Sequence, residues 1–237
     1  MHKEQPMRYK YLLADNDNTL MDFTAAESHA LRETFDTLGL PLDDTAASLY
    51  SRINDGLWKA LERGETTQKA LKVERFRRLF EAMGRHDIDA DAVAALYAQR
   101  LATRADLMPG AMEFLTALHG RMKIALVSNG VSAIQRGRLS RCPFTPLLDA
   151  VIISEEMGVS KPDPAMVFAA LEALGCQDKS EAVLLGDSLT ADIAAARNAG
   201  IDSIYLSRKG DVSDLATFTV TSLRQAQSVL LEEPSYF

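Results

Sequence analysis

Short apolar runs alternate with helical patterns along most of the chain. The helical segments between the runs end at Gly120, Gly175 and Gly200, where glycine accommodates the left-handed turn that follows a helix. One run, residues 203–206, is weaker and is expected nearer a sheet edge. The other runs have the length and composition of buried strands: residues 11–14, 124–127, 151–153 and 182–185. This alternation predicts an α/β fold with a parallel sheet and right-handed crossovers.

One segment breaks the alternation. Residues 23–104 show helical periodicity and no convincing strand. The pattern predicts a helical domain inserted directly after the first strand. Residues 1–22 and 105–237 would then form the α/β domain.

Local signals predict where three helices begin. Thr24 and Glu27 have the spacing of a capping box at the start of the insert, as do Ser222 and Gln225 before a last helix. The dipeptide Asp163-Pro164 is typical of an N-cap followed by proline at the first helical position.

Two carboxylates follow the first predicted strand, in Asp15-Asn16-Asp17-Asn18-Thr19. Residues two apart at a strand exit point the same way, and the carboxyl edge of a parallel sheet is where such folds bind ligands. One carboxylate suits attack on phosphorus and the other protonation of the leaving oxygen; alternatively, the pair holds a divalent cation. Because Asp and Asn favour turns by themselves, the motif alone is equally compatible with an acidic turn.

Other predicted strand ends and loops carry further polar groups. Ser128 and Asn129 either hold phosphate oxygens or form an ordinary strand-to-helix turn. Prolines restrict the loop around Lys161, which makes it a candidate fixed cation, although a lone loop lysine is usually solvated. Asp187 leaves a buried apolar run and therefore needs a metal or a cation as partner. Asp192 has an alternative role, since a carboxylate in the first turn of a helix favours the helix dipole.

Composition and charge narrow the classes of partner. The chain has 237 residues, 47% hydrophobic and 25% charged, as in ordinary globular proteins. Its formal net charge of −7 argues against nucleic-acid polymers, while a few converging cations can still bind one phosphate. We expect no membrane span and no signal peptide. Cys142 and Cys176 form no C-x-x-C pair, which argues against a disulfide framework or a zinc site and favours a cytoplasmic protein.

Together, these motifs resemble the phosphatase branch of the haloacid dehalogenase superfamily. The family's four motifs occur in its order, and the helical insert lies where the family has its C1 cap. The matching residues are Asp15-x-Asp17-x-Thr19, Ser128, Lys161 and Gly186-Asp187-x-x-x-x-Asp192. The resemblance implies a Rossmann-like core with a helical cap domain.

The resemblance also implies a mechanism. Asp15 would attack the phosphoryl group and form an aspartyl-phosphate, while Asp17 would protonate the leaving oxygen and then activate water. Mg²⁺ would be held by the Asp15 carboxylate, the Asp17 backbone carbonyl and Asp187.

The other motif residues would position and neutralise the phosphate. Ser128 and the Asn129 amide would hold an oxygen, and Lys161 would offset negative charge. Asp192 would orient Lys161 or a metal-bound water.

Within the family, the chain is similar to bacterial pyrimidine 5′-nucleotidases. This likeness rests on residues 54–58, 64–67, 75–76 and 151–158. It implies a small phosphate monoester as substrate, a pyrimidine nucleotide first, with phosphoglycolate or a sugar phosphate as the alternative. Asn54 has donor and acceptor groups suited to a pyrimidine edge, whereas Trp58 is more typical of the core of a cap. We expect a monomer or a small homo-oligomer.

Two departures from the family pattern lie in the first motif. Asn16 is polar where relatives often have an apolar residue, which could alter the leaving-group pocket. Asn18 stands where many relatives have Asp, Glu or Gly. Neither position supplies a catalytic carboxylate, so the mechanism is unaffected.

Three other functions fit less well. Gly186-Asp-Ser-Leu189 has the letters of a GDSL esterase signature, but no histidine follows His119 to serve Ser188 as a base. Haloacid dehalogenation requires neither Asp17 nor a metal. A non-catalytic binding module would be favoured by the loss of a motif residue, and none is lost.

Overall fold

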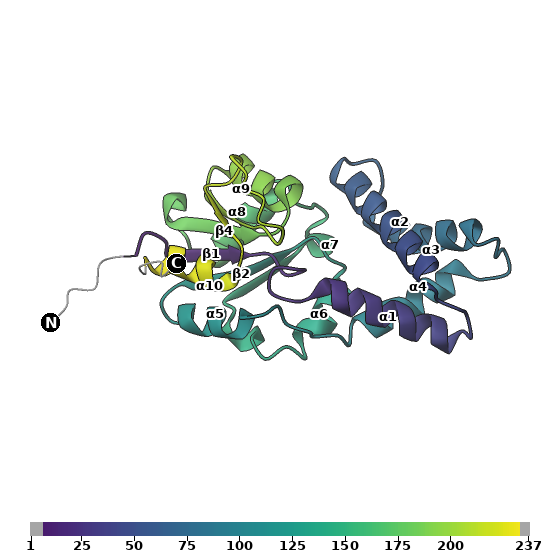
Figure 1. The fold of residues 1–237 in the computed structure, drawn as a ribbon. Coiled ribbons are helices and arrows are strands. Elements are labelled where there is room, and N and C mark those ends of the chain that lie inside the picture. Colours follow the sequence, from purple (N-terminus) through teal and green to yellow (C-terminus); the bar gives the residue numbers. More distant parts are fainter. Residues whose placement is uncertain (1–6, 233–237) are drawn as a thin grey trace. The chain divides into compact units, whose positions relative to one another are not determined.

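The computed structural model describes residues 7–232, which divide into two compact units (Figure 1). One is an α/β unit of residues 7–22, 107–130 and 142–232. The other is helical and contains residues 23–106 together with 131–141. Residues 131–141 were assigned to the α/β domain in the sequence analysis. The roles of the two units as catalytic core and cap stay a prediction.

The α/β unit is built on a six-stranded sheet in the order β3-β2-β1-β4-β5-β6, and all neighbouring strands are parallel. The predicted α/β class is therefore confirmed. The strands are β1 (Tyr11–Ala14), β2 (Lys123–Ser128), β3 (Ala150–Ile153), β4 (Ala182–Gly186), β5 (Asp202–Leu206) and β6 (Phe218–Val220). β1 lies between β2 and β4, with Leu12 opposite Ile124 and Val183. The strand order changes direction at β1, which is where open α/β sheets bind ligands.

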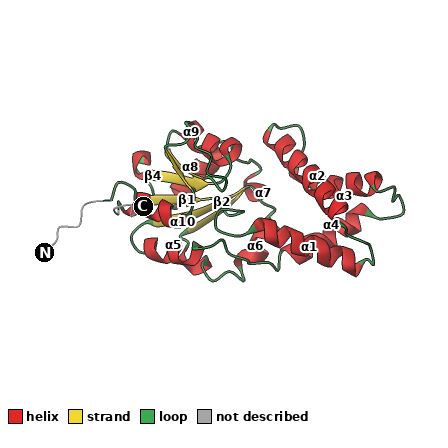
Figure 2. Ribbon diagram, viewed as in Figure 1, coloured by secondary structure: helices red, strands yellow, loops and turns green. Residues whose placement is uncertain are grey.

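Helices cover both faces of this sheet (Figures 1 and 2). Figure 1 shows α8 (Ala165–Ala173) and α9 (Ala194–Ala199) on one face, and α5 (Ala111–Leu118) and α10 (Leu223–Leu231) on the other. Leu13 packs in the core under α8 and α9, and its neighbour Leu12 is equally buried because successive strand residues point to opposite faces. All five residues of β4 are buried, as expected for a strand covered on both sides.

Shorter elements complete the α/β unit. They are α7 (Ser154–Met157), the 3₁₀ turns Thr145–Leu147 and Lys179–Glu181, and a π-helical turn, Leu189–Ile193, that runs into α9. Gly120, Gly175 and Gly200 follow α5, α8 and α9 with φ between 70° and 78°, which confirms the predicted helix ends.

The sequence analysis missed one strand. β6 was not predicted, because a three-residue run carries little periodic signal of its own. β6 is the edge strand and pairs with β5 from Ile204 opposite Phe218 onward, so β5 lies next to the edge, as expected for the weaker run of residues 203–206.

The helical unit contains α1 (Phe23–Thr37), α2 (Asp44–Glu62), α3 (Gln68–Ala82), α4 (Ala90–Leu101) and α6 (Ser132–Leu139). Helix α1 packs on α4, and α3 packs on both α2 and α4. Aromatic rings fill the core: the centroids of Phe76 and Tyr97 are 5.3 Å apart, and those of Tyr50 and Phe76 are 5.5 Å apart. This unit therefore has a hydrophobic core of its own.

Helix starts were predicted with mixed success. Ser222 caps α10 as expected, but the side chain of Gln225 accepts from the Thr221 amide, one residue earlier than in a capping box. Helix α8 begins at Ala165, one residue later than predicted.

The Thr24–Glu27 capping box is not formed as predicted. Helix α1 already starts at Phe23, and the Glu27 carboxylate accepts a hydrogen bond from the Asn54 side chain.

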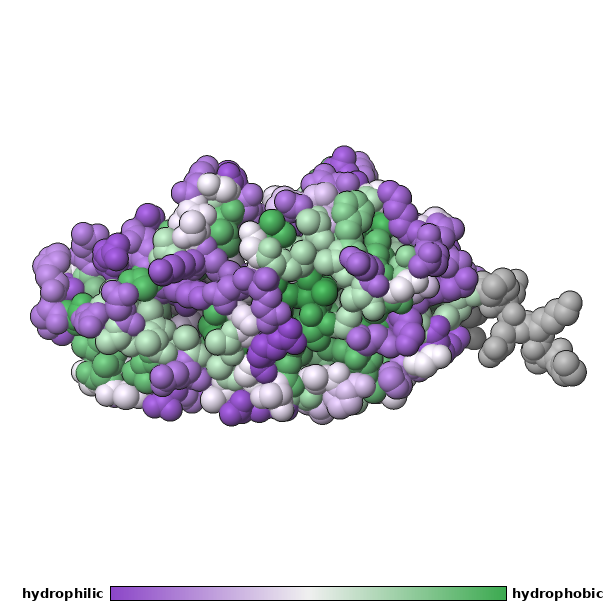
Figure 3. All heavy atoms as spheres, turned by 180° about the vertical axis from the view of Figure 1, so that it is seen from behind, coloured by the Kyte–Doolittle hydropathy of each residue, from purple (hydrophilic) through white to green (hydrophobic). Residues whose placement is uncertain are grey.

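None of the helices in the described part is long and apolar enough to cross a bilayer. Figure 3 shows hydrophilic side chains interspersed with less polar ones over the surface facing the viewer. Large apolar side chains that are exposed among the described residues are Leu38, Phe168, Val212 and Leu215.

Candidate functional site

The α/β unit brings the predicted motif residues to the carboxyl edge of its sheet. Asp15 directly follows β1, Ser128 is the last residue of β2, and Asp187 directly follows β4. Because these three strands are neighbours and parallel, their carboxyl ends meet at one place. Local strand pattern thus determines which side chains gather there.

A buried lysine lies at the centre of this edge. The ammonium of Lys161 is 2.7 Å from Asp15 Oδ1 and 2.7 Å from Asp192 Oδ1, and it donates to the Val127 carbonyl at 2.6 Å. These three acceptors match the three protons of an ammonium group. Lys161 is only 1% exposed, so it is a fixed cation and not a solvated loop lysine.

The charge of Lys161 is maintained by its neighbours. Burial opposes the ammonium, but the carboxylates of Asp15 and Asp192 outweigh that cost and raise the pKa of Lys161 above its ordinary value. Lys161 is therefore positively charged at neutral pH.

Carboxylates outnumber cations around it. Oxygens of Asp15, Asp187 and Asp192 lie within 4.8 Å of one another. Burial, with the Asp192, Asp187 and Asp17 charges, raises the pKa of Asp15 well above its usual range, against the opposing effect of Lys161. Burial and the Asp192 charge likewise raise the pKa of Asp187 to about 6. The cluster therefore has an excess of negative charge that a further cation would neutralise.

The donor set fits a hard divalent cation. Its groups are carboxylate oxygens, which Mg²⁺ prefers, and it contains no thiolate or imidazole of the kind that zinc sites use. Asp192 has both oxygens engaged, by Lys161 and by the Ser188 amide at 3.0 Å. Asp15 and Asp187 are thus the better placed ligands, and Asp192 orients Lys161.

The position of the Asp192 side chain depends on Gly186, which the sequence analysis named only as part of a motif. A Cβ on Gly186 would lie 2.3 Å from Asp192 Cγ and 2.5 Å from its Cβ. Since real Cβ atoms do not approach so closely, a side chain at position 186 would push Asp192 away from Lys161. Gly186 therefore has a steric role.

Asn129 has a role that was not predicted for its side chain. Its amide nitrogen donates to the Lys161 carbonyl at 2.8 Å, and its amide oxygen accepts from the Lys161 backbone N–H at 2.7 Å. This pair of bonds fixes the lysine loop against the end of β2. Ser128, 1% exposed, accepts from the Gly130 amide at 3.0 Å.

The loop after β1 is a compact turn. The Asn16 carbonyl accepts from the amides of Leu20 and Met21, both at 2.9 Å, and Asn16 is fully buried, so its side chain offers no surface to a leaving group. Asn18 has φ of 66°, a left-handed conformation that asparagine adopts more readily than most residues. The left-handed conformation accounts for the asparagine at position 18.

Arg208, in the segment after β5, was missed by sequence reasoning. Its guanidinium donates to the Asn18 carbonyl and lies 3.2 Å from Met108 Sδ, and its charge lowers the pKa of Asp187 against the raising effects of burial and Asp192. Arg208 thus ties the loop that carries Asp17 to the segment after β5. No local pattern marks a lone arginine in a loop.

Asn54 lies in the helical unit, where the structure supplies partners for its side chain. Its amide nitrogen donates to Glu27 at 2.8 Å and its oxygen accepts from Arg75 at 3.2 Å. Asn54 and Arg75 are 2% and 3% exposed. Contact between Asn54 and substrate stays a prediction.

Ser188, the serine of the esterase-like signature, caps the π-helical turn. Its hydroxyl accepts from the Ala191 amide at 3.1 Å. This use of the oxygen agrees with rejecting a serine nucleophile.

Comparisons with known proteins identify the family of the chain and several relatives. A model of the haloacid dehalogenase-like hydrolases matches residues 9–200. The chain is 36% identical over 200 residues to the pyrimidine 5′-nucleotidase PynA of Streptococcus pneumoniae, covering 84% of each chain. It is 30% identical over 227 residues to the pyrimidine 5′-nucleotidase YjjG of Escherichia coli, covering 94% of this chain and 99% of that one.

A solved structure is similar over the same extent. The magnesium-bound HAD-hydrolase YfnB of Bacillus subtilis has a TM-score of 0.88 and 30% identity, covering 94% of this chain and 99% of that one. The resemblance inferred from the motifs is confirmed. The chain belongs to the haloacid dehalogenase-like hydrolase family.

Proposed function

We propose that the protein is a magnesium-dependent phosphatase that hydrolyses nucleoside 5′-monophosphates, pyrimidine nucleotides first, through an aspartyl-phosphate on Asp15. The observation that carries the proposal is the buried contact between Lys161 and Asp15 at a sheet edge rich in carboxylates. The names of PynA and YjjG, both pyrimidine 5′-nucleotidases, support the substrate class.

The first step is attack by Asp15. Lys161 holds Asp15 Oδ1 at 2.7 Å, which leaves the other oxygen of the carboxylate for phosphorus. A bond forms between this oxygen and phosphorus while the bond from phosphorus to the ester oxygen breaks. Asp17 gives its proton to the departing oxygen, which leaves as an alcohol.

The second step returns the enzyme to its starting state. Asp17, now ionised, takes a proton from a water molecule that attacks the phosphorus of the aspartyl-phosphate. The Asp15–phosphorus bond breaks, inorganic phosphate leaves, and Asp17 is protonated again. Ser128, the last residue of β2, would hold a phosphate oxygen during both steps.

Asp15, Asp187 and the Asp17 carbonyl are the groups that would hold Mg²⁺. The bound ion supplies positive charge that keeps Asp15 ionised and offsets the charge of the phosphate. Asp192 and Asn129 serve the same site indirectly, because they fix the ammonium and the backbone of Lys161.

The test is phosphate release from matched substrates, ranked by kcat/KM: uridine, thymidine, adenosine and guanosine monophosphates, phosphoglycolate, and a hexose phosphate. We expect the pyrimidine nucleotides to rank first. An advantage of more than about tenfold for phosphoglycolate or the hexose phosphate corresponds to ~1.4 kcal/mol of transition-state discrimination. That result would contradict the assignment of a nucleotide substrate and would support a phosphatase that acts on a different substrate.

Asp15→Asn tests the chemistry separately from the substrate. We expect turnover to fall by several orders of magnitude, on the order of 10⁴-fold or more, because the route through a covalent intermediate is removed. Circular dichroism checks that the fold is retained. Turnover close to that of the parent protein would contradict the mechanism.

A further inference from the structure

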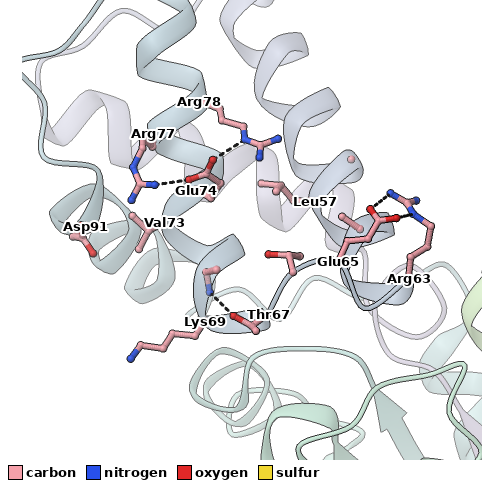
Figure 4. A pocket seen from close by; sticks show the side chains of 14 residues that line it. Leu57, Arg63, Glu65, Thr67, Lys69, Val73, Glu74, Arg77, Arg78 and Asp91 are labelled. Atoms are coloured by element: carbon pink, nitrogen blue, oxygen red, sulfur yellow. Dashed lines mark hydrogen bonds and ion pairs between the residues drawn. The ribbon is translucent and has the colours of Figure 1, made fainter.

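The helical unit has an open groove of about 780 Å³ between α2 and α3 (Figure 4). It is formed by residues of this unit alone. Its volume is in the range of cavities that bind small organic molecules. None of its residues belongs to the carboxylate cluster of the α/β unit.

Small and apolar side chains form part of the groove. Gly56, Leu57 and Ala60 come from α2, and Ala70 and Val73 come from α3. Gly56 and Ala60 are one helical turn apart, so they leave a smooth surface beside Leu57. A flat ring can pack against such a surface.

Charged side chains also line the groove, and the positive ones are in excess. Four lining residues are basic and three are acidic. Glu74 is shared between Arg77 and Arg78, at 2.6 and 2.8 Å, and Figure 4 shows it between the two guanidinium groups. One carboxylate therefore serves two cations. Arg63 pairs with Glu65 separately.

Lys69 lies where the local electrostatic field disfavours its positive charge. It is the second residue of α3, where the positive end of the helix dipole disfavours a cation, and the first turn of α3 contains no acidic residue. Its ammonium makes no ion pair or hydrogen bond within the described part of the chain. An anion at this end of the groove would relieve the conflict and satisfy Lys69 at the same time.

We propose that this groove is a ligand site for a small organic anion with a flat ring, of the chemical class of nucleoside monophosphates. The ring packs on Leu57 and the small residues beside it. The anionic group binds Lys69 and the positive end of α3, and the excess charge at Arg77 and Arg78 assists. Binding here requires no turnover and does not depend on Asp15.

The experiment uses the full chain carrying Asp15→Asn, so that the probe is not consumed. Uridine monophosphate, uridine and inorganic phosphate are each titrated by calorimetry, and the methyl signals of Ala60 and Ala70 are followed by NMR. We expect uridine monophosphate to bind more tightly than either fragment and to shift both methyl signals. Phosphate turnover is not part of the readout, so failure here is distinct from failure of the proposed function.

Three further variants in the same background localise the site. Lys69→Gln removes one exposed ionic contact, so we expect binding to weaken about fivefold. Lys59→Gln is the matched control, since Lys59 is an exposed lysine of α2 that does not line the groove. Gly56→Leu adds bulk to the lining of the groove at a position where a Cβ meets nothing within 4 Å, and it should abolish the methyl shifts.

Two results would overturn the inference. One is unchanged affinity and unchanged methyl shifts in Lys69→Gln, which would place the bound nucleotide elsewhere. The other is equal affinity for uridine and uridine monophosphate, which would remove the role of the cations.

Discussion

Replacing Gly186 by alanine tests whether the close contact with Asp192 holds the buried cation in place. The added Cβ would lie 2.3 Å from Asp192 Cγ and Oδ2. Non-bonded carbon atoms prefer about 3.5–4 Å, so Asp192 has to move by roughly 1 Å or more. That movement lengthens its 2.7 Å contact with Lys161 and its 3.0 Å bond to the Ser188 amide.

The expected cost has two parts. Overpacking a close-packed interior costs about 1–3 kcal/mol. Breaking a buried ion pair outright costs about 3–5 kcal/mol, but a displaced Asp192 keeps part of its interaction with Lys161. We therefore expect the free energy of unfolding to fall by about 3 kcal/mol. A misplacement of about 1 Å near the reacting groups also predicts a drop in kcat of about 10²-fold.

Urea unfolding followed by circular dichroism measures the first effect, and steady-state hydrolysis of an aryl phosphate measures the second. Gly56→Ala is the control for replacing a glycine by itself, because its Cβ meets open space. The double variant Gly186→Ala/Asp192→Gly removes the atoms that clash. It should be no less stable than Asp192→Gly alone, which isolates the coupling between the two positions.

The reasoning would be refuted if Gly186→Ala unfolded at the same urea concentration as the parent and kept its kcat within about twofold. The reasoning would also be contradicted if Gly186→Ala destabilised Asp192→Gly as much as it destabilises the parent protein. The cost would then arise from a contact other than the one with Asp192.

Three further predictions follow from the same site and from the helical unit. Because the pKa of Asp187 is raised to about 6 without metal, protons compete with Mg²⁺. The apparent affinity for Mg²⁺, measured by calorimetry, should therefore fall as the pH drops through that value. Arg208→Gln should lower kcat more than it raises KM, since it loosens the Asn18 turn; a change in KM alone would contradict this. Asn54→Ala should lower the free energy of unfolding by about 1–3 kcal/mol, because it removes the Asn54 oxygen that accepts from the buried guanidinium of Arg75. If Asn54 also contacts substrate, kcat/KM falls on nucleotides and not on an aryl phosphate.

The raised pKa of Asp187 also predicts how the stability of the metal-free protein changes with pH. A carboxyl group whose folded pKa exceeds its unfolded value binds protons more tightly in the native state. Its contribution therefore favours folding at acidic pH and is lost as pH rises through about 6. Mg²⁺ should offset this loss, and thermal unfolding at pH 5 and pH 7.5, with and without the ion, measures the difference.

The sequence by itself determined the strands that end at the site and the carboxylates that follow them. This was predictable because parallel strands share one carboxyl edge, so side chains that follow β1, β2 and β4 gather there whatever the details of packing. The family was recognisable for the same reason, since its motifs are local and ordered along the chain.

Only the tertiary structure decided how those residues act together. Lys161 becomes a fixed cation because Val127, Asp15 and Asp192 converge on it from different segments, and no local pattern encodes that convergence. The same holds for Arg208, whose partner Asn18 lies 190 residues away along the chain. Strand β6 forms because β5 offers an edge to pair with. Local propensity places groups on elements, whereas contacts between distant segments set their distances, burial and charge.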